Sequence, residues 1–214
     1  MWGVKMQSQL YTVDLVCHGV PSPAVWHDYL DYVERKEGEP CTGVNFRDKS
    51  FGWGSHEETF CFASGRKITR STYRYLFYKH YMLRDSCFQC PYTNLRRCSD
   101  VTVADFWGWP KVGGGQFDDN KGMSLVLVNS DKGRELLSEA RAAFHLIKSN
   151  TTDCMQPQLR HPSLRNRLSC KFLSYYRKKN FAQVLNRFGD RSLRAKQEKA
   201  IRQVKDIIKK IIFR

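Results

Sequence analysis

Residues 87–109, CFQCPYTNLRRCSDVTVADFWGW, combine a Cys-x-x-Cys pair, a third cysteine and an alternating segment. The alternation of apolar and polar residues in SDVTVADFWG predicts a β-strand that ends at a cluster of aromatic residues and glycine. Cys87 and Cys90 have the spacing with which two thiolates bind the same metal ion or cluster, and Cys98 follows within reach. On spacing alone, a structural zinc site and an iron–sulfur site are equally open.

Upstream of this segment the pattern predicts strands and helices in turn. LYTVDLVC, residues 10–17, is apolar enough for a strand buried on both faces, and it ends at Cys17 and the turn HGVPS. Ser22 as N-cap and Pro23 at the first helical position then begin a helix that runs to about Lys36. Two short β-like pieces around the Gly-rich FGWG follow and are typical of a meander.

Downstream, MSLVLVNS is a predicted buried strand, and a helix is expected over 130–147. Two or three basic helices follow, with apolar stripes at Phe181, Val184, Leu185 and Phe188, and at Ile201, Val204, Ile208 and Ile211. The sequence therefore predicts an α/β or α+β fold, a mixed sheet with flanking helices. Residues 1–150 are expected to form the body and residues 151–214 a basic helical C-terminal appendage.

Charge is distributed unevenly along the chain. Lys and Arg number 36 against 21 Asp and Glu, and 17 of the basic residues but only 3 of the acidic ones follow residue 154. Aromatic residues are not interleaved with the basic run, so nucleic acid is not an expected partner. The last helix is amphipathic, and we expect it to dock on the body; binding to an anionic membrane surface is the second interpretation.

No apolar run approaches the roughly 20 residues that span a bilayer, and the N-terminal residues lack the apolar core of a signal peptide. We therefore expect a cytoplasmic protein, peripheral at the inner membrane face if the basic tail binds lipid. In a reducing compartment, clustered cysteines more often bind metal or carry out redox chemistry than form disulfides.

The surroundings of the cysteines favour a redox cofactor over a zinc clip. Cys17 follows a strand, where loops often form binding sites. Asp105, Trp107 and Gly108 offer a carboxylate, a flat aromatic surface and a backbone that a ligand can approach closely. These groups suit a planar cofactor, although aromatic residues of this kind also occur simply as core or rim residues.

Five segments, in order along the chain, resemble one known family. They are VDLVCHGVPSPAVWHDYL, FRDKSFGW, LRDSCFQCPY, RRCSDVTVADFWGW and DDNKGMSLVLVNSDKG. Together they are similar to the C-terminal domain of the coenzyme F-420 (F420) hydrogenase/dehydrogenase beta-subunit family over roughly residues 10–135. These proteins are iron–sulfur flavoproteins, and many bacterial members lie among polysaccharide-biosynthesis enzymes.

The resemblance implies that Cys17, Cys87 and Cys90 ligate a 4Fe–4S cluster. A further family cysteine lies in an upstream motif that this chain lacks, so the resemblance implies a C-terminal fragment, or a split or truncated member. Cys98 is then the candidate substitute ligand, and a missing N-terminal half or a ferredoxin-like domain is an expected partner. Ala104 stands where the family usually has glycine, which would cost about 1 kcal/mol if the backbone there needed a positive φ.

The resemblance also implies a flavin, FAD or another, with coenzyme F-420 or another hydride carrier as substrate. The family motifs place the flavin or substrate contacts at Arg47, Lys49, Asp105, Trp107, Gly108, Lys121, Gly122 and Ser124. We expect an oxidoreductase domain for electron transfer between flavin and cluster, with a redox protein as partner; no catalytic residue is predicted. The rivals are a zinc- or cluster-stabilised interaction module without enzymatic activity, and a degenerate fragment that has lost its cofactors.

Overall fold

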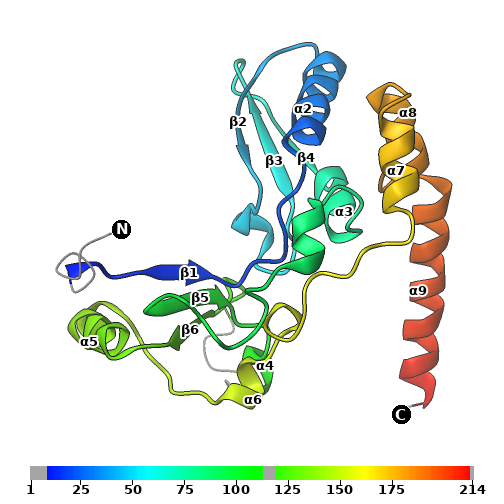
Figure 1. Ribbon diagram of the computed structural model, residues 1–214. Coiled ribbons are helices and arrows are strands. Elements are labelled where there is room, and N and C mark those ends of the chain that lie inside the picture. Colours follow the sequence, from blue (N-terminus) through cyan, green and yellow to red (C-terminus); the bar gives the residue numbers. More distant parts are fainter. Residues whose placement is uncertain (1–8, 113–118, 213–214) are drawn as a thin grey trace. The chain divides into compact units, whose positions relative to one another are not determined.

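The computed structural model describes residues 9–112 and 119–212, and Figure 1 shows the order of its elements. The chain divides into two compact units. Unit 1 contains the residues up to Gly19 and Asp85–Ser163, and unit 2 contains Val20–Arg84 and the residues from Leu164 onward. Each unit carries one three-stranded sheet and several helices, so the predicted mixed α/β class is confirmed. The predicted division near residue 150 stays a prediction.

Unit 1 is built on a sheet with the strand order β1-β5-β6. β1 (Val13–Leu15) pairs in parallel with β5 (Val101–Asp105), and β5 pairs antiparallel with β6 (Ser124–Val128). β5 is the central strand, which explains why its first two residues and Ala104 are buried. β1 and β5 end, and β6 begins, at the same end of this sheet, which we call the carboxyl end.

The prediction of a strand buried on both faces over 10–17 is wrong. Only Val13–Leu15 form a strand, and the side chains of Val13 and Leu15 are 57% and 60% exposed. Among the described strands, β1 pairs only with β5 and lies at the edge of the sheet. An edge strand of three residues needs no apolar cover on both faces, and an apolar sequence does not reveal which strand lies at the edge.

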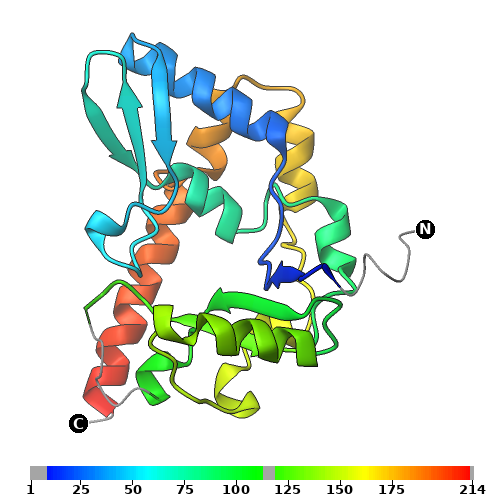
Figure 2. The ribbon, with the colours of Figure 1, turned by 90° about the vertical axis from the view of Figure 1, so that its left-hand side faces the viewer.

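Helix α5 (Asp131–Glu139) runs alongside the sheet of unit 1 (Figures 1 and 2). It begins at the N-cap Ser130, whose hydroxyl accepts from the Gly133 N–H at 3.1 Å and donates to Asp100 at 2.6 Å. The helix ends at Glu139 and a 3-10 turn follows, so the predicted helix over 130–147 is too long. The shorter elements of unit 1 are η2 (Asp85–Gln89), α4 (Trp109–Val112), η3 (Ala140–Ala143), α6 (Thr151–Cys154) and η4 (Pro157–Leu159).

Unit 2 contains an antiparallel meander in the order β2-β3-β4, as the short β-like pieces predict. Helix α2 begins at Pro23, as expected, and ends at Gly38, which adopts the left-handed conformation with φ 77°. The bounds are α2 (Pro23–Glu37), β2 (Cys41–Asn45), η1 (Lys49–Phe51), β3 (Glu58–Phe62), β4 (Lys67–Arg70), α3 (Thr72–Tyr78), α7 (Ser169–Tyr176), α8 (Phe181–Phe188) and α9 (Leu193–Ile212).

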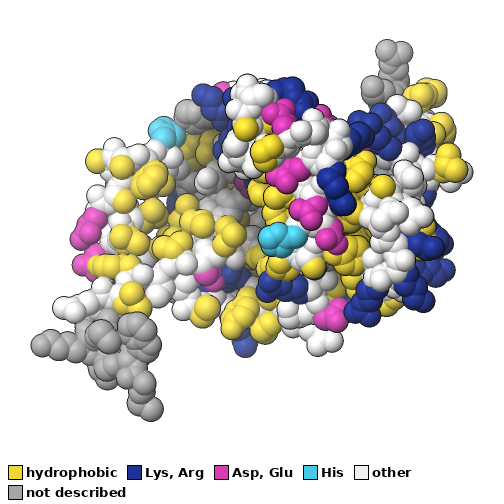
Figure 3. All heavy atoms as spheres, turned by 90° about the horizontal axis from the view of Figure 1, so that it is seen from above, with side chains coloured by type: hydrophobic (Ala, Val, Ile, Leu, Met, Phe, Trp, Pro, Cys, Tyr) yellow, Lys and Arg dark blue, Asp and Glu magenta, His cyan; other side chains and the backbone are white. Residues whose placement is uncertain are grey.

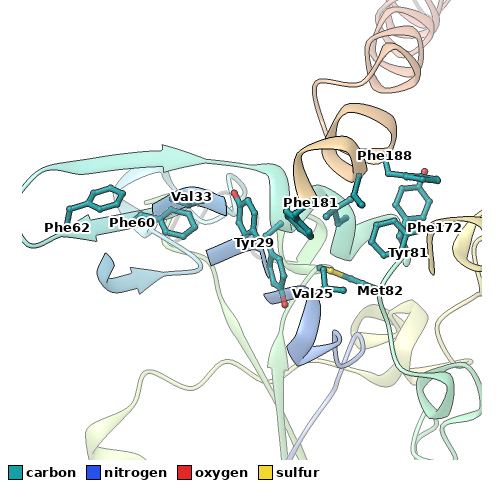
Figure 4. Packing of buried hydrophobic residues seen from close by; sticks show 13 residues of the cluster. Val25, Tyr29, Val33, Phe60, Phe62, Tyr81, Met82, Phe172, Phe181 and Phe188 are labelled. Atoms are coloured by element: carbon teal, nitrogen blue, oxygen red, sulfur yellow. The ribbon is translucent and has the colours of Figure 1, made fainter. Parts of the chain in front are cut away.

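The core of unit 2 joins residues from both halves of the chain. Tyr29 of α2 is fully buried and lies 5.8 Å from Phe60 of β3 and 6.0 Å from Phe181 of α8, measured between ring centroids. Figure 4 shows these rings together with Phe172 and Phe188 of α7 and α8. Helices α7 and α8 are therefore part of this core, and the predicted apolar stripe of α8 is buried in it.

Candidate functional site

The carboxyl end of the unit 1 sheet brings together most of the site residues predicted from the sequence. Asp105 is the last residue of β5 and pairs with Ser124, the first residue of β6. The Val16 N–H donates to the Val103 carbonyl at 3.0 Å, so the pairing of β1 with β5 continues up to the residue before Cys17. Trp107 and Gly108 follow β5 after Phe106, and Lys121 and Gly122 precede β6, from which Met123 separates them.

The loop that carries Cys17 is held in place by the segment around η4. The Ser163 hydroxyl donates to the His18 carbonyl, and the Gln158 side-chain nitrogen lies 3.1 Å from His18 Nδ1. Gly19 has a φ of 152°, a backbone conformation that suits glycine. Cys17 itself is exposed. Its backbone is thus fixed on both sides while the residue remains accessible.

Arg97 ties the cysteine-rich loop to β1. Its side chain is only 3% exposed and forms an ion pair with Asp14 at 2.7 Å. The same guanidinium donates to the Leu15 carbonyl at 3.3 Å and to the Tyr92 carbonyl. Burial acts to raise the pKa of Asp14, but hydrogen bonds from Thr102 and Arg97 together with the arginine charge hold it below its ordinary value. Arg97 therefore fastens the loop between Cys90 and Cys98 to β1, the strand that precedes Cys17.

Cys17 and Cys87 lie close in sequence to the same pair of hydrogen-bonded residues. The Arg84 N–H donates to the Val20 carbonyl at 3.0 Å. Cys17 precedes Val20 by three residues, and Cys87 follows Arg84 by three. Both cysteines therefore lie within three residues of a boundary between the two units. Cys90 follows at the end of η2.

The thiols do not form a preassembled cluster site. None of the eight cysteines, all in the described part of the chain, forms a disulfide; Cys17 and Cys98 are exposed, while Cys87 and Cys90 are partly buried. Within residues 9–112 and 119–212, no three His, Cys, Asp or Glu side chains gather closely enough to hold a metal ion. Thiolates are the right ligands for an iron–sulfur cluster, but their arrangement here does not fit one. The structure therefore assigns no electron-transfer step to a cluster.

A cavity of about 800 Å³ extends along β6. Ligand pockets commonly measure roughly 300–1,000 Å³. Phe106, Trp109, Leu125 and Leu127 line it with apolar surface, and Ser124 links it to the carboxyl end of the sheet. Its basic lining residues come from α5 and the segment after it, and no Asp or Glu is among the lining residues in the described part of the chain. These basic residues are Arg134, Arg141, His145 and Lys148.

The basic residues of this cavity were not predicted as site residues. They follow one another at spacings of seven, four and three, which is the spacing of one helical face. That spacing was the one sequence signal for a basic wall, but the segment also has the pattern of an ordinary amphipathic helix. Because α5 ends at Glu139, Arg141 instead reaches the cavity from η3, and His145 and Lys148 reach it from the irregular segment after η3.

Two further expectations concern glycine near β5. A Cβ added to Gly108 would lie 2.2 Å from the Asp153 carbonyl oxygen, so close packing against α6 explains this glycine without a ligand. Ala104 lies in β5 and is 8% exposed, and it is not among the described residues with positive φ. The cost expected for alanine at a positive φ therefore does not arise.

Arg47 and Lys49 lie in unit 2, whereas all the other predicted site residues lie in unit 1. Lys49 is exposed and begins η1, while Arg47 is partly buried. Between them, Asp48 accepts from the Ser50 N–H at 3.0 Å and from the Thr59 hydroxyl at 2.6 Å. The turn therefore has a structural reason, and a cofactor role for its two basic residues stays a prediction.

One comparison with known proteins gave a match. The family model that describes the C terminus of the coenzyme F420 hydrogenase/dehydrogenase beta subunit matches residues 4–153. Comparisons with curated proteins and with solved structures found none. The matched segment includes all three strands of the unit 1 sheet, the four predicted cysteine ligands and the predicted flavin contacts. It ends before α7, α8 and α9.

Proposed function

Because the chain belongs to the coenzyme F420 hydrogenase/dehydrogenase beta-subunit family, we propose that it is the flavin-binding domain of an oxidoreductase subunit. The family consists of subunits of oxidoreductases, which implies a redox role and a partner subunit. The observation that carries the flavin proposal is the cavity along β6, where apolar and aromatic surface meets a purely basic set of charges. We place FAD, or another flavin, in this cavity.

The chemistry of the cavity lining matches the two parts of a flavin. Phe106 and Trp109, whose ring centroids are 6.2 Å apart, provide aromatic surface for a planar ring. Arg141 and Lys148 provide cations for phosphate groups, and arginine can bind phosphate through two parallel hydrogen bonds. A bound flavin supplies hydride and single-electron chemistry. The protein excludes water over the apolar wall and offsets negative charge with its cations.

The carboxyl end of the sheet is the proposed approach for the substrate, coenzyme F420 or another hydride carrier. Ser124 supports this placement because it lines the cavity and also pairs with Asp105 at the strand end. Lys121 and Gly122, both exposed, lie two to three residues before Ser124. Asp105, Trp107, Gly108, Lys121 and Gly122 remain predicted contacts of the flavin or the substrate.

We also propose that Cys17, Cys87 and Cys90, with Cys98 as fourth ligand, hold a 4Fe–4S cluster in the assembled oxidoreductase. Support comes from the thiolate chemistry of these side chains and from the family match, which covers all four cysteines. Because the thiols are not preassembled, cluster binding must rearrange the loop. A redox partner or a ferredoxin-like domain is the expected neighbour of the exposed Cys17 and Cys98.

Flavin retention after desalting tests the cavity assignment. The purified chain, incubated with FAD or FMN, should retain flavin with quenched fluorescence, because ring stacking on an aromatic side chain quenches emission. Arg141→Ala should weaken binding about tenfold, the effect of one lost charge-assisted contact. Arg35→Ala, which removes an exposed arginine from α2, is the matched control and should bind as the parent does.

Two results would contradict this assignment. Failure of the parent chain to retain flavin would remove the cavity as its site. A loss in Arg47→Ala that equals the loss in Arg141→Ala would require a binding site that includes unit 2.

A further inference from the structure

Helix α9 is attached to unit 2 by one side of its first turns. Ala195 is 7% exposed, and Glu198 forms an ion pair with Lys79, the residue that follows α3. Glu198 also accepts from Arg194 Nε at 2.9 Å and from the Tyr75 hydroxyl at 3.4 Å. Figure 1 shows that the rest of α9 continues beyond α7 and α8. These contacts define the attached side of the helix.

The apolar stripe of α9 lies on the side away from these contacts. Val204 follows Ala195 by nine residues, which at about 100° per residue places it on the opposite side of the helix. Ile211 follows Ala195 by sixteen residues and lies close to the same direction. The stripe is exposed throughout: Ile201 56%, Val204 54%, Ile207 58%, Ile208 47% and Ile211 70%. The attachment of α9 to the rest of unit 2 therefore leaves this stripe uncovered, and the expectation that α9 docks on the body stays a prediction.

The remaining surface of α9 is basic. The helix contains seven Lys and Arg against two acidic residues, a net charge of 7 − 2 = +5. Lys199, Arg202 and Lys205 are exposed, and Glu198, one of the two acids, is already paired. Figure 3 shows Lys and Arg side chains gathered over the part of unit 2 that contains α7, α8 and α9. An exposed apolar stripe thus runs beside a strongly cationic face.

We propose that α9 binds in the plane of an anionic lipid surface. The stripe enters the apolar boundary of the bilayer, while the long Lys and Arg side chains reach the anionic headgroups beside it. At 1.5 Å per residue the 20-residue helix is about 30 Å long. None of the helices in the described part of the chain is long and apolar enough to cross a membrane, so α9 lies along the surface.

Charge decides between lipid and a second copy of the chain as the partner. Two α9 helices packed stripe to stripe would bring two +5 surfaces together, and like charges at an interface oppose association. An anionic lipid surface is complementary to the same charges and attracts each nearby Lys or Arg. The membrane surface is therefore the occupant that fits both the stripe and its surroundings.

Vesicle sedimentation with the full chain tests the proposal. The probes are vesicles of phosphatidylcholine alone and vesicles of phosphatidylcholine with phosphatidylglycerol. We expect binding to the anionic vesicles, weakened by added salt because the attraction is screened. Val204→Asp should lower the affinity about tenfold, since it places a charge in the apolar boundary. Gln203→Asp adds the same charge at the next exposed residue, on the polar face, and should lower it less than about threefold.

Four results would overturn the proposal. They are no binding to either vesicle, equal binding to both, equal losses in the two variants, and lipid-free self-association that Val204→Asp abolishes. The last would identify a second copy as the occupant. Circular dichroism of both variants should be unchanged, because both side chains are exposed. The outcome is independent of flavin binding, which is assigned to unit 1.

Discussion

Replacement of Gly108 by alanine separates a packing role for this glycine from a cofactor role. The added Cβ would lie 2.2 Å from the Asp153 carbonyl oxygen and 3.0 Å from Phe106 Cε2. Contacts below 3.0 Å do not occur at a real Cβ, so the backbone of α6 must move by at least 3.0 − 2.2 = 0.8 Å. The obstacle is backbone, which cannot rotate away as a flexible side chain can.

The expected loss of stability follows from this displacement. Overpacking of a well-packed region costs about 1–3 kcal/mol, and a backbone obstacle favours the upper part of that range. For a chain of this size, ~3 kcal/mol corresponds to a decrease in Tm of roughly 6–12 °C. The decrease should appear with no flavin or metal bound, because Asp153 and Phe106 belong to the protein itself.

Thermal unfolding followed by circular dichroism measures the effect. Gly54→Ala is the matched control, since nothing lies within 4 Å of the position that its Cβ would take and its φ is not positive. That variant should unfold within about 2 °C of the parent chain. If Gly108→Ala instead unfolds with the parent and loses only flavin binding, then the glycine serves cofactor approach and the packing explanation is refuted.

Three further predictions concern buried or partly buried charges. Hydrogen bonds from neighbouring hydroxyl and N–H groups lower the pKa of Asp100 to about 2 from 3.8, so its stabilising effect is complete above pH 3.8 and is lost as the pH falls through 2. In Asp100→Asn, the free energy of unfolding measured with urea should therefore decrease less between pH 3.8 and 2 than in the parent chain. An unchanged decrease would contradict this. Burial raises the pKa of Glu58 from 4.5 to about 7. The sign is therefore opposite: the contribution of Glu58 to stability is greatest below pH 4.5 and falls by roughly 3 kcal/mol as the pH rises through 7. Glu58→Gln should remove this pH dependence of the free energy of unfolding. If the dependence persists in that variant, Glu58 is not its source. Arg97→Met leaves Asp14 without its cation and should destabilise the chain by about 3 kcal/mol; it should also speed alkylation of Cys90, and an unchanged rate would show that Arg97 does not fasten the loop.

The sequence predicted those helices and strands whose formation depends on residues close together in the chain. Ser22 and Pro23 predicted the start of α2, because proline fixes φ at the first helical position. The alternation in VTVAD predicted β5, the central strand of unit 1. These features depend on neighbouring residues alone, so one sequence suffices to find them.

Features that depend on distant pairing were not predictable in this way. β1 and β5 pair although Val13 and Val101 are separated by 88 positions, and only this pairing reveals that β1 lies at the edge. The exposed stripe of α9 has the same periodicity as the buried stripe of α8, so periodicity does not show which one faces the core. Arg97 likewise reads as a surface charge until its ion pair with Asp14 is seen.

The segments of the candidate site were named from motifs. The sheet brings the segments around Cys17, Asp105 and Ser124 to one end, and their role as a site stays a prediction. The basic wall of the cavity was missed because it is assembled across the end of α5, where the chain leaves the helix. Cofactor binding by these segments stays a prediction.

The central claim is a redox domain that holds a flavin and, after rearrangement of its thiols, an iron–sulfur cluster. Cofactor analysis tests it most directly. The purified chain is reconstituted anaerobically with iron, sulfide and flavin, and all three are then measured together with zinc. The account predicts one flavin per chain, reduced in Arg141→Ala, and equal amounts of iron and sulfide that are lost in Cys87→Ser. Stoichiometric zinc with neither flavin nor iron would contradict it and identify a zinc-stabilised interaction module instead.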